Sequence, residues 1–287
     1  MNKTMPELNL APPGEAVKTV IEAPRGWQAI NLRELWQYRE LLFFLAWRDI
    51  QVRYKQTVFG ATWAVLQPFM TMVIFSLIFG SFLKIPSDGL PYPVFIYSAL
   101  IPWTFFASAL SRSANSLVYD ANLISKVYFP RLLLPIAAVL SQLVDFAVAF
   151  LVLLGLMAFF GILPGIAVVA LPVFILLAFL TALGVGLWLS ALNVKYRDVG
   201  YIIPFLTQFW FFITPVSYPI SVIPQRWLFL YSLNPMVGVI EGFRWALLGQ
   251  GSLPGSVIFI SSAVVLLVFI GGLFYFRRRE VQFADVV

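Results

Sequence analysis

The sequence has 287 residues, of which 61% are hydrophobic and only 11% are charged. A soluble domain carries about 25% charged residues, so most of this chain does not face water. The sequence contains no Cys and no His, which excludes thiol catalysis, disulfide bonds, His proton relays and the usual zinc ligand sets. The long apolar runs do not alternate with polar residues, which favours an all-α polytopic membrane protein over a β-barrel.

The N-terminal part divides into a tail and an amphipathic stretch. Residues 1–26 contain several prolines, lack the pattern of a cleaved signal peptide and are predicted to form a flexible cytoplasmic tail. The rest of the chain, 27–287, is predicted to form one transmembrane domain that begins with an interface helix over about 31–56. An ordinary surface helix of a soluble protein is the alternative, and the long apolar run that follows argues against it.

Two faces define this interface helix. One is polar or charged and consists of Glu34, Gln37, Glu40, Arg48, Gln51 and Lys55. The other is apolar and consists of Leu35, Trp36, Leu42, Phe43, Ala46 and Trp47. The cations Arg48, Arg53 and Lys55 stand directly before the first long apolar run, where cations mark a cytoplasmic membrane entry.

Six stretches are long enough to cross a hydrocarbon core about 30 Å thick, which takes about 20 residues each. The predicted spans are 60–83, 92–110, 132–160, 166–192, 199–216 and 256–276. Residues 111–125 are a polar patch between two of them. The segment 217–255 contains Pro219, Pro224, Pro235 and Pro254 among short apolar runs, which is typical of re-entrant or interfacial helices. Within it, Glu241 and Arg244 lie three residues apart and can pair, with either a structural or a substrate-related role.

Orientation follows from the distribution of positive charge. If both termini are cytoplasmic, all but Lys84, Arg226 and Arg244 of the 19 Lys and Arg lie on the inner side. The inverted arrangement reverses this ratio. The net charge of +6 therefore reflects membrane topology, and we expect no nucleic-acid partner.

No motif for catalysis is present. The sequence lacks a GxxxxGK[ST] phosphate-binding loop and therefore an ATP site of its own, and it lacks paired catalytic carboxylates. We expect no catalytic residue, no metal site and no cofactor in this chain. Asp145 is the one acid placed deep inside a predicted span. It is either a proton-coupling group or, as we prefer, a structural group that forms hydrogen bonds with neighbours such as Ser141 and Gln142.

Two cytoplasmic patches interrupt the apolar pattern. In the first, Asn122 to Arg131, a short segment ends at Phe-Pro and suits a brief helix along the membrane face. Its residues Leu123, Ile124, Val127 and Tyr128 are candidates to contact a partner, and a plain loop is the alternative. In the second patch, Asn193 to Val199, Asp198 is predicted to cap the helix that follows.

Aromatic residues crowd the middle of the fifth predicted span. Packing against lipid is the simple explanation, and a lining that stacks on sugar rings is the alternative. The candidates for a channel lining are Phe205, Phe209, Trp210 and Phe212.

Several long segments resemble the permease subunit of polysaccharide-exporting ABC transporters of the ABC-2 type, which include O-antigen, capsule and teichoic-acid exporters. They are RELLFFLAWRDIQVRYKQTVFGATWAVLQP from Arg39 to Pro68, NLISKVYFPRLLLP from Asn122 to Pro135, NVKYRDVGYIIPFLTQFWFFITPVSYP from Asn193 to Pro219, and LNPM from Leu233 to Met236. The resemblance begins near Trp27 and runs to the C-terminus.

The resemblance implies a homodimer in the bacterial inner membrane, paired with two copies of a separate ATPase that binds ATP and Mg²⁺. It implies export of a glycan, often linked to a polyprenyl pyrophosphate. Contact with the ATPase is expected at Leu35, Trp36, Arg39, Asn122, Leu123, Ile124, Lys126, Val127 and Tyr128. The family's outer gate is expected at Asn234, Pro235, Glu241 and Arg244. Arg48, Arg53 and Lys55 are candidates to attract the anionic headgroup, or else to anchor the helix to lipid.

Other functions remain open on the sequence alone. One is an ABC-2 exporter of a small molecule or drug. Another is an ion-driven secondary carrier, which needs intramembrane acids, and Asp145 is nearly the only one. A membrane enzyme acting on lipid-linked sugars lacks the acid–base pair that the chemistry needs.

Overall fold

The computed structural model describes residues 32–55, 62–249, 255–280 and 283. Residues 31–287 belong to one compact unit, to which the following description refers. Every regular element in its described part is helical. The all-α prediction is therefore confirmed, whereas the predicted tail over 1–26 lies outside the described residues.

Among the residues that the structure describes, five helices are long and apolar enough to cross a membrane. They are α3 (Thr62–Phe75) with its π-helical continuation η1 (Ser76–Phe82), α4 (Tyr92–Tyr119), α6 (Leu133–Phe159), the 3-10 turn η2 (Ile166–Ala170) with α7 (Leu171–Lys195), and α11 (Gly255–Glu280). These correspond to five of the six predicted spans. Helix α4 lies at the centre of the bundle and contacts α3, α6, α7 and α10 (Pro235–Leu248).

The remaining predicted span, 199–216, is shorter in the structure. Helix α8 (Val199–Phe212) has 14 residues, which is about 21 Å of helix and less than the hydrocarbon thickness. After Ile213 the chain turns instead of continuing as a helix. Pro215 explains this end, because a proline disfavours helical geometry at the preceding residue and donates no amide hydrogen bond.

The polar patch over 111–125 is helical as well. Helix α4 continues through the patch to Tyr119, and after Asp120 a short helix α5 (Ala121–Lys126) follows. The expectation of a short helix in this region is met by α5, and the preceding polar residues, for which no element was predicted, extend α4. Arg112 consequently belongs to α4, about two turns before its end.

Glycines allow α7 and α11 to approach closely. A Cβ at Gly184 of α7 would come within 2.8 Å of the Cα of Phe269 in α11. Small residues at such crossings let membrane helices pack backbone against backbone. A substitution at Gly184 would therefore push these two helices apart.

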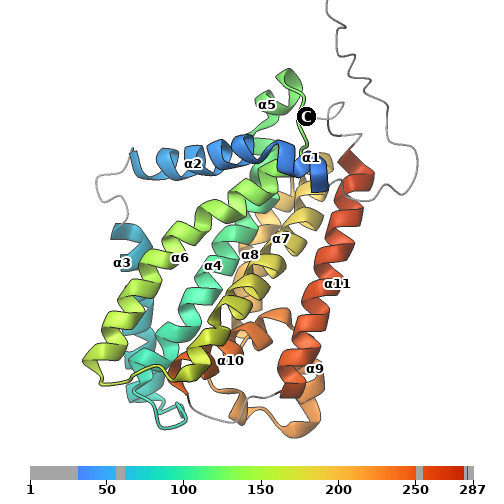
Figure 1. The fold of residues 1–287 in the computed structure, drawn as a ribbon. Helices are drawn as coiled ribbons and strands as arrows, with labels where there is room; N and C mark the ends of the chain where they lie inside the picture. Colours follow the sequence, from blue (N-terminus) through green and yellow to red (C-terminus); the bar gives the residue numbers. More distant parts are fainter. Residues whose placement is uncertain (1–31, 56–61, 250–254, 281–282, 284–287) are drawn as a thin grey trace, which may run out of the picture. The chain divides into compact units, whose positions relative to one another are not determined.

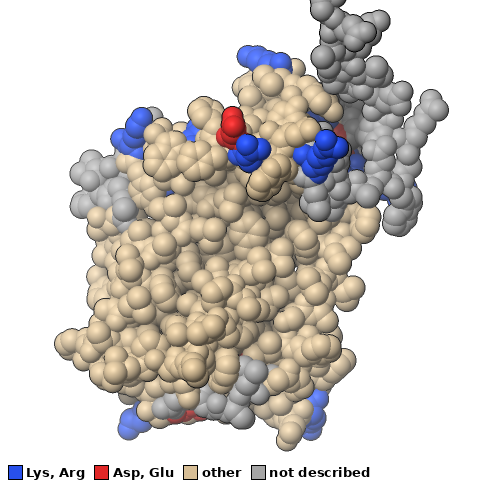
Figure 2. All heavy atoms as spheres, viewed as in Figure 1, with Lys and Arg blue, Asp and Glu red and all other residues tan. Residues whose placement is uncertain are grey.

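The short elements gather at the two ends of the bundle. Helices α1 (Leu32–Gln37), α2 (Arg39–Lys55) and α5 lie at one end, and α9 (Leu228–Ser232) with α10 lies at the other (Figure 1). Two 3-10 turns, η3 (Ile220–Val222) and η4 (Gln225–Trp227), lead into α9. In Figure 2 the charged side chains occupy both ends, and the visible surface between them is almost free of charge. An uncharged band between charged ends is the pattern of a protein that crosses a bilayer.

The predicted interface helix differs from the expectation in two respects. It is divided at Tyr38 into α1 and α2. Its predicted apolar face also does not pack uniformly on the protein, because Phe43 is 70% exposed and Trp47 is 49% exposed, while Leu45 and Ala46 are the buried residues. Helix α2 packs on α6, and some of its charged side chains, including Arg48 and Arg53, point toward the bundle.

Candidate functional site

An ion pair joins α2 to the end of α4. The guanidinium of Arg48 contacts Asp120 through two hydrogen-bonding distances, 2.8 Å between Nη1 and Oδ1 and 2.9 Å between Nη2 and Oδ2. Asp49, the next residue of α2, accepts a further bond of 2.9 Å from the same guanidinium. The hydrogen bond that Arg48 donates to Asp120 raises the pKa of Arg48 above its usual value, despite partial burial. Since Asp120 directly precedes α5, this pair ties α2 to that short helix.

A second ion pair joins α2 to α6. Arg53 forms an ion pair with Asp145, and its side chain is 18% exposed against 26% for the carboxylate. Arg53 also donates to Gln142 Oε1 at 3.2 Å and to Ser141 Oγ at 3.3 Å. Asp145, which the sequence suggested to be an isolated intramembrane acid, is therefore paired within the chain. This geometry agrees with the structural role and names a partner, Arg53, that the sequence did not indicate.

The tyrosine beside Arg53 belongs to the same cluster. The hydroxyl of Tyr54 donates to Oδ1 of Asp145, so two neighbouring residues of α2 hold one carboxylate of α6. Burial, together with the adjacent Asp145 carboxylate, raises the pKa of Tyr54 to about 12. Tyr54 is consequently a neutral hydrogen-bond donor at physiological pH.

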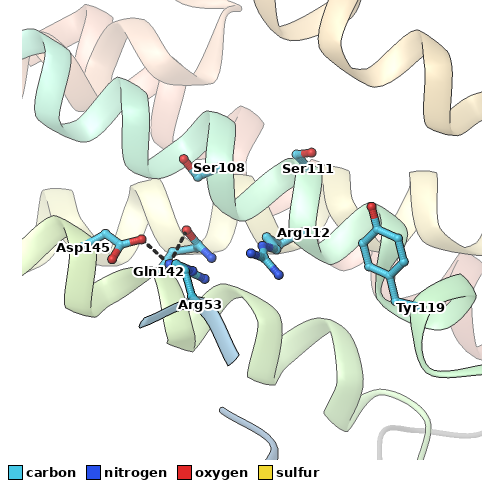
Figure 3. Close-up of a pocket in the computed structure, with 7 residues that line it drawn as sticks. All are labelled: Arg53, Ser108, Ser111, Arg112, Tyr119, Gln142 and Asp145. Atoms are coloured by element: carbon cyan, nitrogen blue, oxygen red, sulfur yellow. Dashed lines mark hydrogen bonds and ion pairs between the residues drawn. The ribbon is translucent and has the colours of Figure 1, made fainter. Parts of the chain in front are cut away.

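A pocket opens beside this cluster, between α2, α4 and α6 (Figure 3). Its volume is about 500 Å³, within the range of small-molecule sites. It is lined by Arg53, Ser108, Ser111, Arg112, Tyr119, Gln142 and Asp145. Its walls are thus mostly polar, although two of the three helices that form it, α4 and α6, are apolar spans.

The short helix α5 and the two residues after it expose most of the side chains that were predicted to contact the ATPase. Asn122, Lys126, Val127 and Tyr128 are exposed, and Leu123 is half-buried. Ile124 differs from the expectation, because it is only 6% exposed and fastens α5 to the bundle. The other residues predicted to contact the ATPase belong to α1 and α2, and they are exposed or half-buried. Arg39 is exposed and lies over the exposed ring of Trp36 at 5.5 Å, whereas Leu35 is half-buried.

The aromatic residues of α8 separate into two faces. Phe205, Phe209 and Phe212 are 71%, 58% and 61% exposed, and their spacing places them along one side of the helix. Trp210 points the other way. Its ring packs edge-on against Phe106 at 5.0 Å, and its indole donates to Asn234 Oδ1 at 2.8 Å. The prediction of Trp210 as a channel-lining residue is therefore not supported by its position, since it packs within the bundle.

The residues predicted for an outer gate form two sets of hydrogen bonds, and each set reaches the turn after α8. Asn234 accepts a bond from the backbone amide of Met236 and so caps α10, whose first residue is Pro235. Arg244 pairs with Glu241 at 3.0 Å and donates to the carbonyl of Val216 at 2.7 Å. Both side chains of the pair are almost fully buried, and the bond from Arg244 to Val216 fastens the turn after α8 to α10.

The predicted cap of α8 is made by a different residue. Asp198 occupies the N-cap position, but its side chain makes no capping hydrogen bond. Asn193 of α7 instead accepts a bond of 3.1 Å from the amide of Gly200 and donates to the carbonyl of Ala114 in α4. The position of Asp198 was thus identified correctly, whereas its capping role was wrong.

Three residues of this region were not singled out from the sequence, namely Tyr54, Arg112 and Asp120. Sequence analysis could have placed Arg112 in a helix, because no proline between residues 103 and 129 interrupts the continuation of the second predicted span through the polar patch. The partners of Arg48 and Arg53 are 72 and 92 residues away, and no local pattern indicates such pairs.

The fold and these sites define a polytopic α-helical membrane protein with interface helices at one end and a buried polar network at the other. A family model described as the ABC-2 type transporter matches residues 40–248. The chain belongs to this family. Residues 40–248 include the pocket, α5, α8 and the network around Asn234.

Curated relatives align over most of their length. The chain is 34% identical over 262 residues to the O-antigen export system permease protein RfbA of Myxococcus xanthus, which covers 89% of this chain and 98% of the relative. It is 26% identical over 249 residues to a protein of the same name from Klebsiella pneumoniae, covering 86% and 95%. It is 27% identical over 238 residues to the polysialic acid transport protein KpsM of Escherichia coli, covering 81% and 91%.

Proposed function

We propose that this chain is the permease subunit of an ATP-driven exporter that moves a polysaccharide across the bacterial inner membrane. The observation that carries the proposal is the alignment with an O-antigen export permease over 98% of that protein's length, together with the family match. Alignments with polysialic acid transport proteins support the same substrate class. Both termini are cytoplasmic in this proposal, because the ends of α2 and α11 carry clustered cations.

Energy comes from a separate ATPase that binds ATP and Mg²⁺. The permease acts as a homodimer with two ATPase copies. Its contact surface consists of the exposed residues of α5 and of the two residues that follow it, namely Asn122, Lys126, Val127 and Tyr128, and of Trp36 and Arg39 in α1 and α2. An exposed tyrosine and valine beside a cation suit a partner groove with an acidic rim.

Movement of α5 passes to α2 through the Arg48–Asp120 pair and from α2 to α6 through the Arg53–Asp145 pair. Ion pairs between rigid helices transmit displacement because they resist separation of their partners. In this mechanism α2 is a lever between the ATPase contact surface and the span α6. The cations Arg48 and Arg53 serve this lever, since each already holds an acid of the same chain.

The exposed aromatic stripe of α8 forms part of the glycan path. Flat aromatic faces stack on the C–H faces of sugar rings, and Phe205, Phe209 and Phe212 are presented together on one side of α8. The buried network around Asn234 and Arg244 closes the outer end of the path.

Deletion of the gene tests the function directly. The expected result is loss of surface polysaccharide with accumulation of lipid-linked glycan inside the cell, both restored by a plasmid copy. A normal amount of surface polysaccharide in the deletion strain would contradict the proposal. If the strain instead became sensitive to a small toxic compound with its glycan intact, the chain would be a small-molecule exporter. Ion-gradient-driven transport by the chain alone in vesicles would identify a secondary carrier.

A further inference from the structure

Arg112 is a cation in an apolar helix that the described part of the chain leaves without a partner. It lies in α4, is half-buried, and makes no hydrogen bond or ion pair with any residue that the structure describes. A charged group within a membrane-spanning helix is costly unless something compensates it, and such residues commonly mark the path of a substrate. The described residues therefore supply no counter-charge for Arg112.

The guanidinium faces the pocket between α2, α4 and α6 (Figure 3). The other cation of the pocket, Arg53, is balanced by Asp145, so the lining retains the positive charge of Arg112. Ser111 and Tyr119, on the same wall, carry hydroxyl groups that donate to no group in the described ranges. One unbalanced guanidinium with two available hydroxyl donors is a set that binds a phosphate group, since an arginine fork matches phosphate oxygens.

The depth of Arg112 fits the phosphate level of a bilayer. Helix α4 begins at Tyr92 at the end of the bundle where α9 and α10 lie. Twenty residues of helix separate Tyr92 from Arg112, which is about 30 Å and equals the hydrocarbon thickness. Arg112 therefore lies where a lipid phosphate meets the hydrocarbon on the side of α2 and α5.

We propose that this pocket binds the phosphate-bearing headgroup of a lipid, with Arg112 as the anion ligand and Ser111 and Tyr119 as hydrogen-bond donors. That this lipid is the pyrophosphate-linked carrier of the glycan rests on the proposed function. Arg53 and Asp145 form one wall of the pocket, so a bound headgroup lies against the pair that joins α2 to α6.

Direct binding to the purified permease–ATPase complex tests the assignment. The probes are a polyprenyl pyrophosphate, phosphatidylglycerol and inorganic pyrophosphate, each titrated into the complex in detergent and detected by native mass spectrometry. The variants are Arg112→Gln, Arg112→Lys and Ser111→Ala. The matched control is Arg278→Gln, which removes an exposed cation from α11, a helix that contributes no residue to the pocket. Co-purification of the ATPase reports that each variant is folded.

The expected result is an affinity for polyprenyl pyrophosphate at least about tenfold lower in Arg112→Gln, because a charge-assisted hydrogen bond is lost. Arg112→Lys retains part of the affinity, and Arg278→Gln binds like the wild type. Inorganic pyrophosphate competes only weakly, because it lacks the lipid chain. Ser111→Ala reduces the affinity by a smaller factor and provides the test if Arg112→Gln does not fold.

Two results would overturn the proposal. One is unchanged binding in Arg112→Gln and in Ser111→Ala. The other is displacement of the polyprenyl pyrophosphate by an equal concentration of phosphatidylglycerol, which would assign the pocket to bulk phospholipid. Either result leaves the polysaccharide-export function standing, because that function is judged independently by the surface glycan of the deletion strain.

Discussion

Arg53 of α2 and Asp145 of α6, 92 residues apart in the sequence, form an ion pair beside a polar pocket. The pair is partly buried, and Tyr54 donates to the same carboxylate. It attaches the interface helix to a membrane span at a point where apolar packing is sparse, because only Leu45 and Ala46 of α2 are buried. Polar contacts thus supply much of the attachment of α2.

Removal of this pair should loosen α2. For Arg53→Gln and Asp145→Asn we expect a coupling free energy of about 1–2 kcal/mol, between the values of exposed and fully buried pairs. A double-mutant cycle in reversible SDS unfolding of the purified permease measures it. Arg278→Gln, which neutralises an exposed cation elsewhere, should change the free energy of unfolding little. Additive effects of the two substitutions would show that the pair contributes nothing.

The hydroxyl of Tyr54 predicts a dependence on alkaline pH. The pKa of Tyr54 is raised to about 12 in the folded state, from about 10 in an unfolded chain. The contribution of this group is therefore complete below pH 10 and is lost as the pH rises toward 12. Thermal unfolding between pH 9 and 12 should show a steeper loss of stability for the wild type than for Tyr54→Phe. Parallel curves would contradict the assigned environment of Tyr54.

The two faces of α8 predict opposite consequences for neighbouring residues. Phe209→Ala should lower glycan export several-fold but change the unfolding free energy by less than about 1 kcal/mol, because the ring is largely exposed. Trp210→Phe should cost about 1 kcal/mol, the worth of its hydrogen bond to Asn234, and should leave export near normal. Export assays in cells and SDS unfolding separate the two effects. Normal export by alanine variants of Phe205, Phe209 and Phe212 would show that these side chains do not line the glycan path.

The fold was predictable where local pattern decides it. Apolar length indicated the five long spans, and cation clusters indicated the ends of the bundle. The pattern gave the wrong length for α8, because it counted apolar residues across Pro215, and it ended the span that corresponds to α4 at residue 110, before the polar end of that helix. A polar sequence can remain helical when its side chains face a pocket, as those of Ser108, Ser111 and Arg112 do.

The candidate site was less predictable because it depends on contacts between distant segments. The sequence drew attention to Arg48, Arg53 and Asp145 separately, but only the packing of α2 across α6 brings Arg53 to Asp145. The same packing places Arg48 against Asp120. Likewise, periodicity places Phe209 and Trp210 on different faces of α8, but it does not indicate which face meets the bundle.

The role of α2 as a lever is tested most directly by two matched substitutions around Arg48. Asp120→Asn weakens the contact of Arg48 with the end of α4 next to α5, whereas Asp49→Asn removes the same chemistry within α2 and leaves that contact intact. The measurement is the amount of glycan exported per ATP hydrolysed by the permease–ATPase complex in membrane vesicles. We predict that Asp120→Asn lowers this ratio while ATP hydrolysis continues, and that Asp49→Asn leaves it unchanged. An equal ratio in the two variants and the wild type would contradict the lever.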